Sequence, residues 1–151
     1  MKRYSLLVEG IVQGVGFRPF VYALAKKHNL FGFVKNTADG VYVEIQGDEN
    51  SCKSFCEQLE KTAPEQAIIN GVSVNEIPIK NENDFVIQNS STGEHNALIS
   101  PDIGVCDDCL NDVFDSANRR YGYAFTNCTN CGPRFSIVED IPYDRKNTTM
   151  S

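Results

Sequence analysis

The first ninety residues alternate between the two-residue hydrophobic period of strands and the longer period of helices. Residues 4–9 alternate as in a strand, and the alternation breaks at Gly10. From Phe20 to His28 the apolar residues recur at helical spacing, and Pro19 suits the first position of a helix. The pattern therefore predicts a strand that ends at Gly10, then a loop, then a helix that begins at Pro19.

The same two periods predict the rest of this part. Further strands are expected at residues 31–36, 41–45, 72–77 and 85–87, and a second helix is expected at residues 48–63, before Pro64. The first two of these strands are joined by a turn that ends in Asp39-Gly40, a hairpin signal. The order of strand, helix, strand, strand, helix, strand predicts an α+β fold of the ferredoxin-like type, with two helices on one face of a sheet.

Two cysteines lie one turn apart in the second predicted helix. Cys52 and Cys56 could bind a metal at that spacing, but no further ligand lies nearby in the sequence. They share a helix face with Phe55 and Leu59, so burial in the core is the favoured interpretation.

The loop between the first strand and the first helix has the composition of an anion site. Gly14 and Gly16 lack β-carbons, so successive backbone N–H groups can converge on one anion at a helix N-terminus. Arg18 adds a planar cation that matches phosphate geometry. The loop lacks both the Lys-Ser/Thr of the nucleotide-binding P-loop and the GxGxxG dinucleotide pattern. These residues alone leave open a plain turn with a surface arginine.

Asn36 is expected at the end of a strand, next to the hairpin turn. Its amide offers a donor and an acceptor, which suits it to hold a water molecule beside an arginine-bound phosphoryl group. The alternative is that Asn36 caps the turn.

The strings VQGVGFRPF and GFVKNTADGVYVEIQG resemble the acylphosphatase family. The resemblance implies that Arg18 binds the substrate phosphate, that Asn36 orients the attacking water, and that Thr37 helps to hold Asn36. It also implies a backbone cradle for the phosphate, formed by Gln13, Gly14, Val15, Gly16 and Phe17. The implied reaction is hydrolysis of carboxyl phosphates or carbamoyl phosphate, with no metal, cofactor or covalent intermediate in the hydrolytic step.

A polar stretch at residues 88–93 indicates a domain boundary near residue 90. We expect a first domain at residues 1–90, a linker at residues 91–103 that contains His95, and a second domain at residues 104–151. His28 is expected to end the first helix, and neither histidine has a partner motif that would make it a general base.

The second domain contains two CxxC knuckles, Cys106 with Cys109 and Cys128 with Cys131. Eighteen residues separate the knuckles, a spacing typical of a structural zinc site, and Gly132 lets the last turn close. Four sulfur ligands leave no position for water, so a catalytic role is not expected. Iron would suit the same ligands. Disulfides or free thiols are the alternatives, but the absence of a signal peptide favours a reducing, cytoplasmic location.

The charge balance disfavours polyanions as partners. The 151 residues carry a formal net charge of −6, and from Thr92 onward five Lys or Arg stand against nine Asp or Glu. Nucleic-acid binding needs a basic surface, so we do not expect it. A membrane partner is not expected either, because the chain has no apolar run of spanning length, no basic amphipathic helix and no lipidation signal.

The stretch from SPDIGVCDDC through CTNCGPR to PYDRKNTTM resembles the zinc-finger segment of the HypF family, whose chains begin with an acylphosphatase-like domain. The resemblance implies that carbamoyl phosphate is cleaved here and that the carbamate is then adenylated with ATP in domains absent from this chain. The carbamoyl group would pass to the C-terminal cysteine of HypE. The thiocarboxamide formed there would later be dehydrated to a cyanide ligand of the hydrogenase iron.

Three interpretations follow from the two resemblances. The family continues into a second pair of CxxC knuckles, so the first is an N-terminal fragment that can perform at most the hydrolytic step. The second is a stand-alone acylphosphatase with an appended zinc module. The third is a non-catalytic, protein-binding zinc module.

Overall fold

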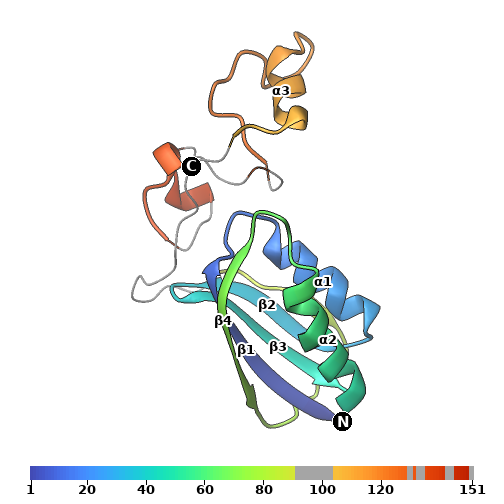
Figure 1. Cartoon of the computed structure of the whole chain (residues 1–151). Coiled ribbons are helices and arrows are strands. Elements are labelled where there is room, and N and C mark those ends of the chain that lie inside the picture. Colours follow the sequence, from blue (N-terminus) through green and yellow to red (C-terminus); the bar gives the residue numbers. More distant parts are fainter. Residues whose placement is uncertain (91–103, 129–130, 132–134, 142–144, 150–151) are drawn as a thin grey trace.

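The computed structural model describes residues 1–90, 104–128, 131, 135–141 and 145–149 (Figure 1). The first part is a five-stranded sheet of order β4-β1-β3-β2-β5 with two helices against it. Its elements are β1 (Lys2–Ile11), α1 (Phe17–Lys27), β2 (Phe31–Thr37), β3 (Gly40–Gly47), α2 (Glu49–Lys61), β4 (Ile68–Glu76) and β5 (Phe85–Ile87). The predicted α+β, ferredoxin-like architecture is confirmed.

The sheet pairing brings two distant loops to one end of the molecule. Strand β1 pairs antiparallel with β3, and β3 pairs antiparallel with β2, so β1 and β2 run in the same direction. The loop after Ile11 and the turn after Thr37 therefore lie at the same end of the sheet. This topology can bring Arg18 and Asn36 together although they belong to different elements.

The core lies between the sheet and the two helices. The alternating residues of β1 and β3 and the apolar faces of α1 and α2 supply it, as the sequence periods predict. Cys52 is 1% exposed and Cys56 packs partly buried against the same cluster. Burial raises the pKa of the Cys52 thiol to about 11. The interpretation of these cysteines as core residues is confirmed.

The two predicted boundaries next to the β1–α1 loop were wrong. Strand β1 does not end at Gly10 but continues to Ile11, with a bulge between Glu9 and Gly10. Gly10 has a φ of 130°, and a β-carbon there would lie 2.0 Å from the backbone oxygen of Ile68, so the glycine serves a close approach to β4. Helix α1 begins at Phe17 and not at Pro19. Pro19 therefore lies in the first turn, where backbone N–H groups have no helical acceptor and a proline is tolerated.

The opposite face of the sheet carries a buried ionic network. Arg3 is fully buried and donates to Glu44 (Nε to Oε2, 3.0 Å), to Gln46 and to Glu82 of the segment between β4 and β5. Burial alone would raise the pKa of the Glu44 carboxyl, but hydrogen bonds from Arg3 and Lys80 outweigh it and lower that pKa. The network fastens the segment over the sheet.

We expect Arg3→Leu to lower the free energy of unfolding by about 3–5 kcal/mol, because it leaves Glu44 buried without its main partner. Urea unfolding followed by circular dichroism measures the loss. The control is Lys2→Leu, which breaks an exposed ion pair with Glu76 and should cost less than about 1 kcal/mol. The pKa of the Glu44 carboxyl is lower in the folded protein than in the unfolded chain. The contribution of this carboxylate to the free energy of unfolding is therefore fully present above the unfolded-state pKa, and it disappears as the pH falls through the folded-state pKa. The Arg3 deficit should therefore shrink in acid; equal losses in the two variants would contradict this account.

The second part consists of α3 (Asp107–Phe114) and two short 3-10 helices, η1 (Phe135–Ile137) and η2 (Arg145–Asn147). An isolated bridge between Val138 and Thr148 links the regions after η1 and η2. Figure 1 shows this part above the end of the sheet where the β1–α1 loop lies. The expected linker with His95, and Gly132, lie outside the described residues. No helix in the described ranges is long and apolar enough to cross a membrane.

Candidate functional site

The loop between β1 and α1 adopts the backbone shape that an anion cradle requires. Gly14 has a φ of 73° and Gly16 a φ of 77°, both in the left-handed region that glycine adopts without strain. Gly16 is the N-cap of α1 and makes no side-chain capping bond. Val15 and Phe17 are almost fully buried in the core, so they anchor the loop, while Gly14 and Gly16 line a cleft.

Gln13 ties this loop to the β2–β3 turn. Its side chain is 4% exposed, and Nε2 donates to the backbone oxygens of Thr37 (2.7 Å) and Gly40 (3.0 Å). The Thr37 hydroxyl donates to the Gly40 oxygen (3.2 Å) and accepts from the Asp39 N–H (3.3 Å). The Gln13 side chain thus positions the turn beside the cradle, a role that the sequence pattern did not indicate.

Arg18 and Asn36 line the same cleft as the two glycines. Arg18 lies in the first turn of α1 and is half-buried, and Asn36 lies in β2 with 1% of its surface exposed. The cleft has a volume of about 880 Å³. The structure therefore brings together a guanidinium, an amide and a helix N-terminus, which is a chemistry suited to a phosphoryl group and a water molecule.

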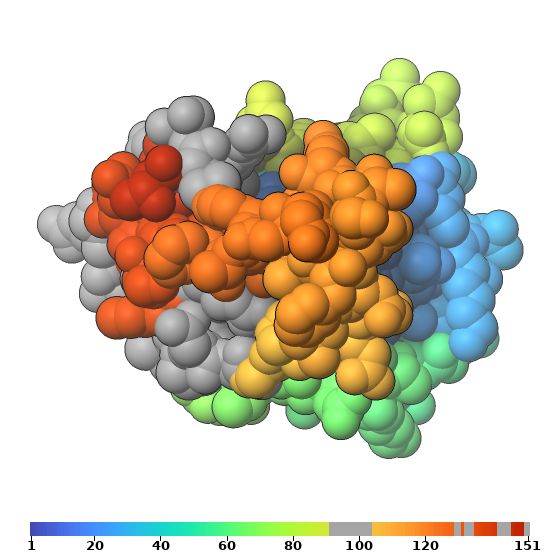
Figure 2. Space-filling model, turned by 90° about the horizontal axis from the view of Figure 1, so that it is seen from above, coloured from blue at the N-terminus to red at the C-terminus, as the bar shows by residue number. Residues whose placement is uncertain are grey.

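The other wall of the cleft comes from the second part of the chain. Figure 2 looks down on this end of the molecule, with the orange residues of the second part over the sandwich and beside the blue residues of the first. The wall includes Arg119, Arg120, Tyr121, Tyr123, Phe125 and Cys128. Sequence reasoning assigned none of the arginines and aromatics to a phosphate site, because a contact between segments a hundred residues apart leaves no local pattern.

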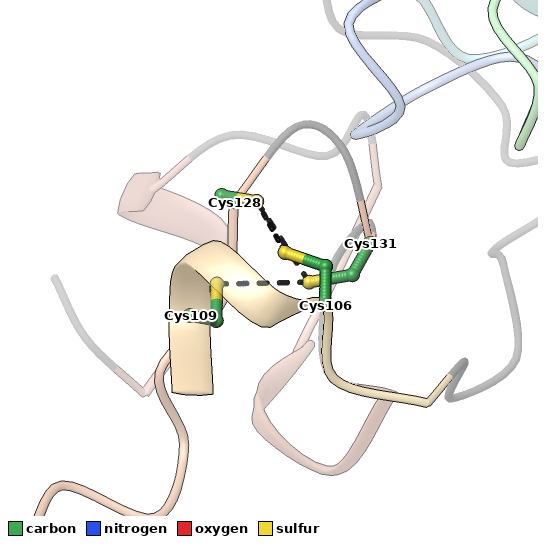
Figure 3. Close-up of side chains that lie close together, drawn as sticks. All are labelled: Cys106, Cys109, Cys128 and Cys131. Carbon is green, nitrogen blue, oxygen red and sulfur yellow. Dashed lines mark hydrogen bonds between the residues drawn. The ribbon is translucent and has the colours of Figure 1, made fainter. Parts of the chain in front are cut away.

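The four cysteines of the two knuckles converge (Figure 3). Their sulfurs all lie within 4.8 Å of one another, and the sulfur pairs 106–128, 109–131 and 128–131 are 3.5, 3.8 and 3.9 Å apart. A tetrahedral zinc ion with bonds of about 2.3 Å would place its sulfurs about 3.8 Å apart, so the donor set fits zinc. None of these cysteines is disulfide-bonded.

Two elements hold the cysteines in place. Cys106 is the N-cap of α3 and Cys109 lies in its first turn, so one short helix presents both thiols of the first knuckle. Burial raises the pKa of the Cys109 thiol, and the neighbouring sulfurs raise it further. A bound divalent cation reverses this effect, because it stabilises the thiolates that coordinate it.

Comparisons with known proteins match both parts of the chain to known families. Residues 4–87 match the acylphosphatase family, and residues 105–138 match the HypF finger family. An acylphosphatase of Thermotoga maritima is 42% identical over 89 residues, which are 58% of this chain and 98% of that protein. The first part is an acylphosphatase domain, and the chain belongs to the acylphosphatase family.

The second match specifies which member of that class the chain resembles. Carbamoyltransferase HypF of Synechocystis is 46% identical over 151 residues, all of this chain and 20% of that protein. The crystal structure of full-length HypF in the phosphate- and nucleotide-bound form superposes with a TM-score of 0.87 at 46% identity, over 99% of this chain and 20% of that one. The chain corresponds to the N-terminal region of HypF carbamoyltransferases and spans about a fifth of their length.

Proposed function

We propose that this chain hydrolyses carbamoyl phosphate, and more slowly other acyl phosphates, in the cleft between its two parts. The observation that carries the proposal is that Arg18 and Asn36 line one cleft with two left-handed glycines at a helix N-terminus. The acylphosphatase family supplies the reaction class, and the HypF relatives favour carbamoyl phosphate as the substrate.

In the proposed mechanism the backbone N–H groups from Gly14 to Phe17 and the Arg18 guanidinium hold the phosphoryl oxygens. Asn36 orients a water molecule for attack on phosphorus. The water oxygen bonds to phosphorus, the bond from phosphorus to the bridging oxygen breaks, and its electron pair leaves with the carbamate or carboxylate. The water proton passes to phosphate or solvent. Gln13 and Thr37 act as positioning residues that hold the turn next to Asn36.

Zinc is proposed as a structural ion bound by Cys106, Cys109, Cys128 and Cys131. The ion when bound supplies cross-linking and no chemistry, because four sulfur ligands leave no position for water or substrate. The four cysteines organise the wall of the cleft to which Cys128 belongs.

We further propose a division into an acylphosphatase domain at residues 1–90, a linker at 91–103 and a zinc-finger domain at 104–151. In the cytoplasm this hydrolysis would be the first step of a HypF carbamoyltransferase, and it would supply the carbamate for the later steps. ATP-dependent adenylation and transfer to the HypE cysteine would be carried out by regions of a HypF protein that this chain does not span. The supporting fact is the match of the whole chain to one fifth of HypF.

The function is tested by measuring phosphate release from carbamoyl phosphate and benzoyl phosphate by the wild-type chain and Asn36→Ala. We expect the wild-type chain to turn over both substrates and to prefer carbamoyl phosphate. In Asn36→Ala, kcat should decrease by about 100-fold to 1000-fold. The affinity of the variant for inorganic phosphate should change little, because the variant loses only the positioning of water. The control is Asn75→Ala, at an exposed position of β4. A folded wild-type chain that binds phosphate without turnover would overturn the proposal and favour a binding module; a preference for benzoyl phosphate would favour a general acylphosphatase.

A further inference from the structure

We propose that Arg119, in the second part of the chain, contacts the acyl end of the substrate and stabilises the carboxylate or carbamate that departs. The inference rests on the proposed hydrolysis and extends it, since it makes the zinc-finger segment a part of the substrate site. Arg119 lines the same cleft as Arg18 but comes from the opposite wall.

The loop that carries Arg119 is fixed to α3. Asp112 accepts hydrogen bonds from the Asn118 side chain (2.9 Å) and from Nη1 of Arg120 (2.9 Å). The Asn118 side-chain oxygen in turn accepts from the Arg120 N–H (2.9 Å), and Gly122 donates to the Val113 oxygen (2.9 Å). Because the loop is anchored at both sides of Arg119, it holds the base of that side chain at the cleft before any ligand arrives.

The two neighbouring arginines have different electrostatic surroundings. Arg120 forms an ion pair with Asp112. Within the described ranges no ion pair involves Arg119, whose side chain is exposed at the cleft. Arg119 therefore carries a positive charge that is available to an anion in this wall.

The reaction creates a need for such a charge. Cleavage of the phosphorus–oxygen bond transfers negative charge to the bridging oxygen of the acyl group. In the proposed pose Arg18 and the cradle hold the phosphoryl oxygens, so the new charge develops on the side of the cleft away from them. The part of the cleft wall that belongs to the second part of the chain also contains Tyr121, Tyr123 and Phe125, whose rings offer apolar surface to the acyl end of the substrate.

The test compares the wild-type chain, Arg119→Gln and Arg119→Lys on a series of acyl phosphates whose carboxylic acids differ in pKa. We expect Arg119→Gln to lower kcat about 10-fold for the best leaving groups and about 100-fold for the poorest, because poorer leaving groups carry more charge in the transition state. KM should change less, and Arg119→Lys should recover part of kcat. The control is Lys146→Gln, which removes one charge from the same part of the chain at an exposed position outside the cleft wall.

A second measurement tests the contact between Arg119 and a carboxylate without turnover. Calorimetry measures the binding of acetate to each protein in saturating inorganic phosphate, which mimics the product pair. We expect acetate to bind wild type and Lys146→Gln and to bind Arg119→Gln at least 10-fold more weakly. If Arg119→Gln shows wild-type leaving-group dependence and wild-type acetate binding, the inference is wrong while the proposed hydrolysis stands. If the wild-type chain has no turnover, the proposed function fails and the role of Arg119 toward a leaving group fails with it; the acetate measurement then shows only whether Arg119 binds a carboxylate in the cleft.

Discussion

Replacement of Arg18 by alanine is expected to lower kcat/KM for carbamoyl phosphate by at least about 1000-fold, the range in which a single arginine acts on phosphoryl transfer. Arg18 lies in the first turn of α1, where its charge adds to the N–H groups of the loop and the helix N-terminus. Arg18→Lys should recover only a small part of the activity, because an ammonium group cannot donate two parallel hydrogen bonds to a phosphoryl group. Steady-state phosphate release measures both effects.

The control for Arg18 lies on the same helix. Lys27→Ala removes an exposed cation at the last turn of α1 that contacts Gln58 and does not line the cleft. We expect wild-type hydrolysis from it, and both variants should retain the circular dichroism spectrum of the wild type. A folded Arg18→Ala protein that keeps wild-type activity would show that the cradle is not the reaction site.

Removal of zinc is expected to unfold the second part of the chain and leave the acylphosphatase domain folded. The buried apolar residues among the described residues of the second part are Cys109, Cys131, Ile137 and Ile141, two of which are predicted ligands. So small a core cannot offset the conformational entropy of the segment, whereas a structural zinc ion contributes about 10 kcal/mol or more to folding. Metal analysis, circular dichroism and urea unfolding before and after chelation measure this effect.

Cysteine variants separate the metal site from the other thiols. Cys109→Ser should lose zinc and unfold the second part, and Cys52→Ala, in the core of the first part, should retain one zinc ion per chain and lose only folding stability. A chain that holds no metal after expression with zinc, or one whose second part stays folded after chelation, would contradict the structural role. Because Cys128 lines the cleft, zinc removal should also abolish the acetate binding that we assign to Arg119.

The elements that the sequence predicts well are those with a strong local pattern. The alternation in β1 and β3 and the helical spacing around Phe55 reflect one buried and one exposed face, and Asp48 caps α2 as its residue type suggests. The start of β4 at Ile68 was missed, because this edge strand is mostly exposed and its apolar residues do not alternate cleanly. The sequence predicts a strand end at Gly10 where the structure has a bulge, because a bulge glycine and a terminal glycine look alike in one sequence.

The residues of the two candidate sites also differ in how far the sequence predicts them. The spacing of the four cysteines predicts their convergence, because two tight turns can be recognised locally, and the structure confirms the cluster. The roles of Arg18, Asn36 and the loop stay predictions, although the structure brings these residues to one cleft. The bridge made by Gln13 and the wall that contains Arg119 depend on pairing between distant segments, which no single-sequence period encodes.

The most direct test of the central claim is hydrolysis of carbamoyl phosphate in water enriched in ¹⁸O, with the products analysed by mass spectrometry and parallel reactions of the Arg18→Ala and Lys27→Ala variants. We expect the wild-type chain and Lys27→Ala to release phosphate with one ¹⁸O atom per turnover, because water attacks phosphorus. Arg18→Ala should release no more phosphate than the buffer alone. Phosphate without the label would show attack at the acyl carbon, and wild-type release equal to that of buffer would show no catalysis; either result would contradict the proposed mechanism.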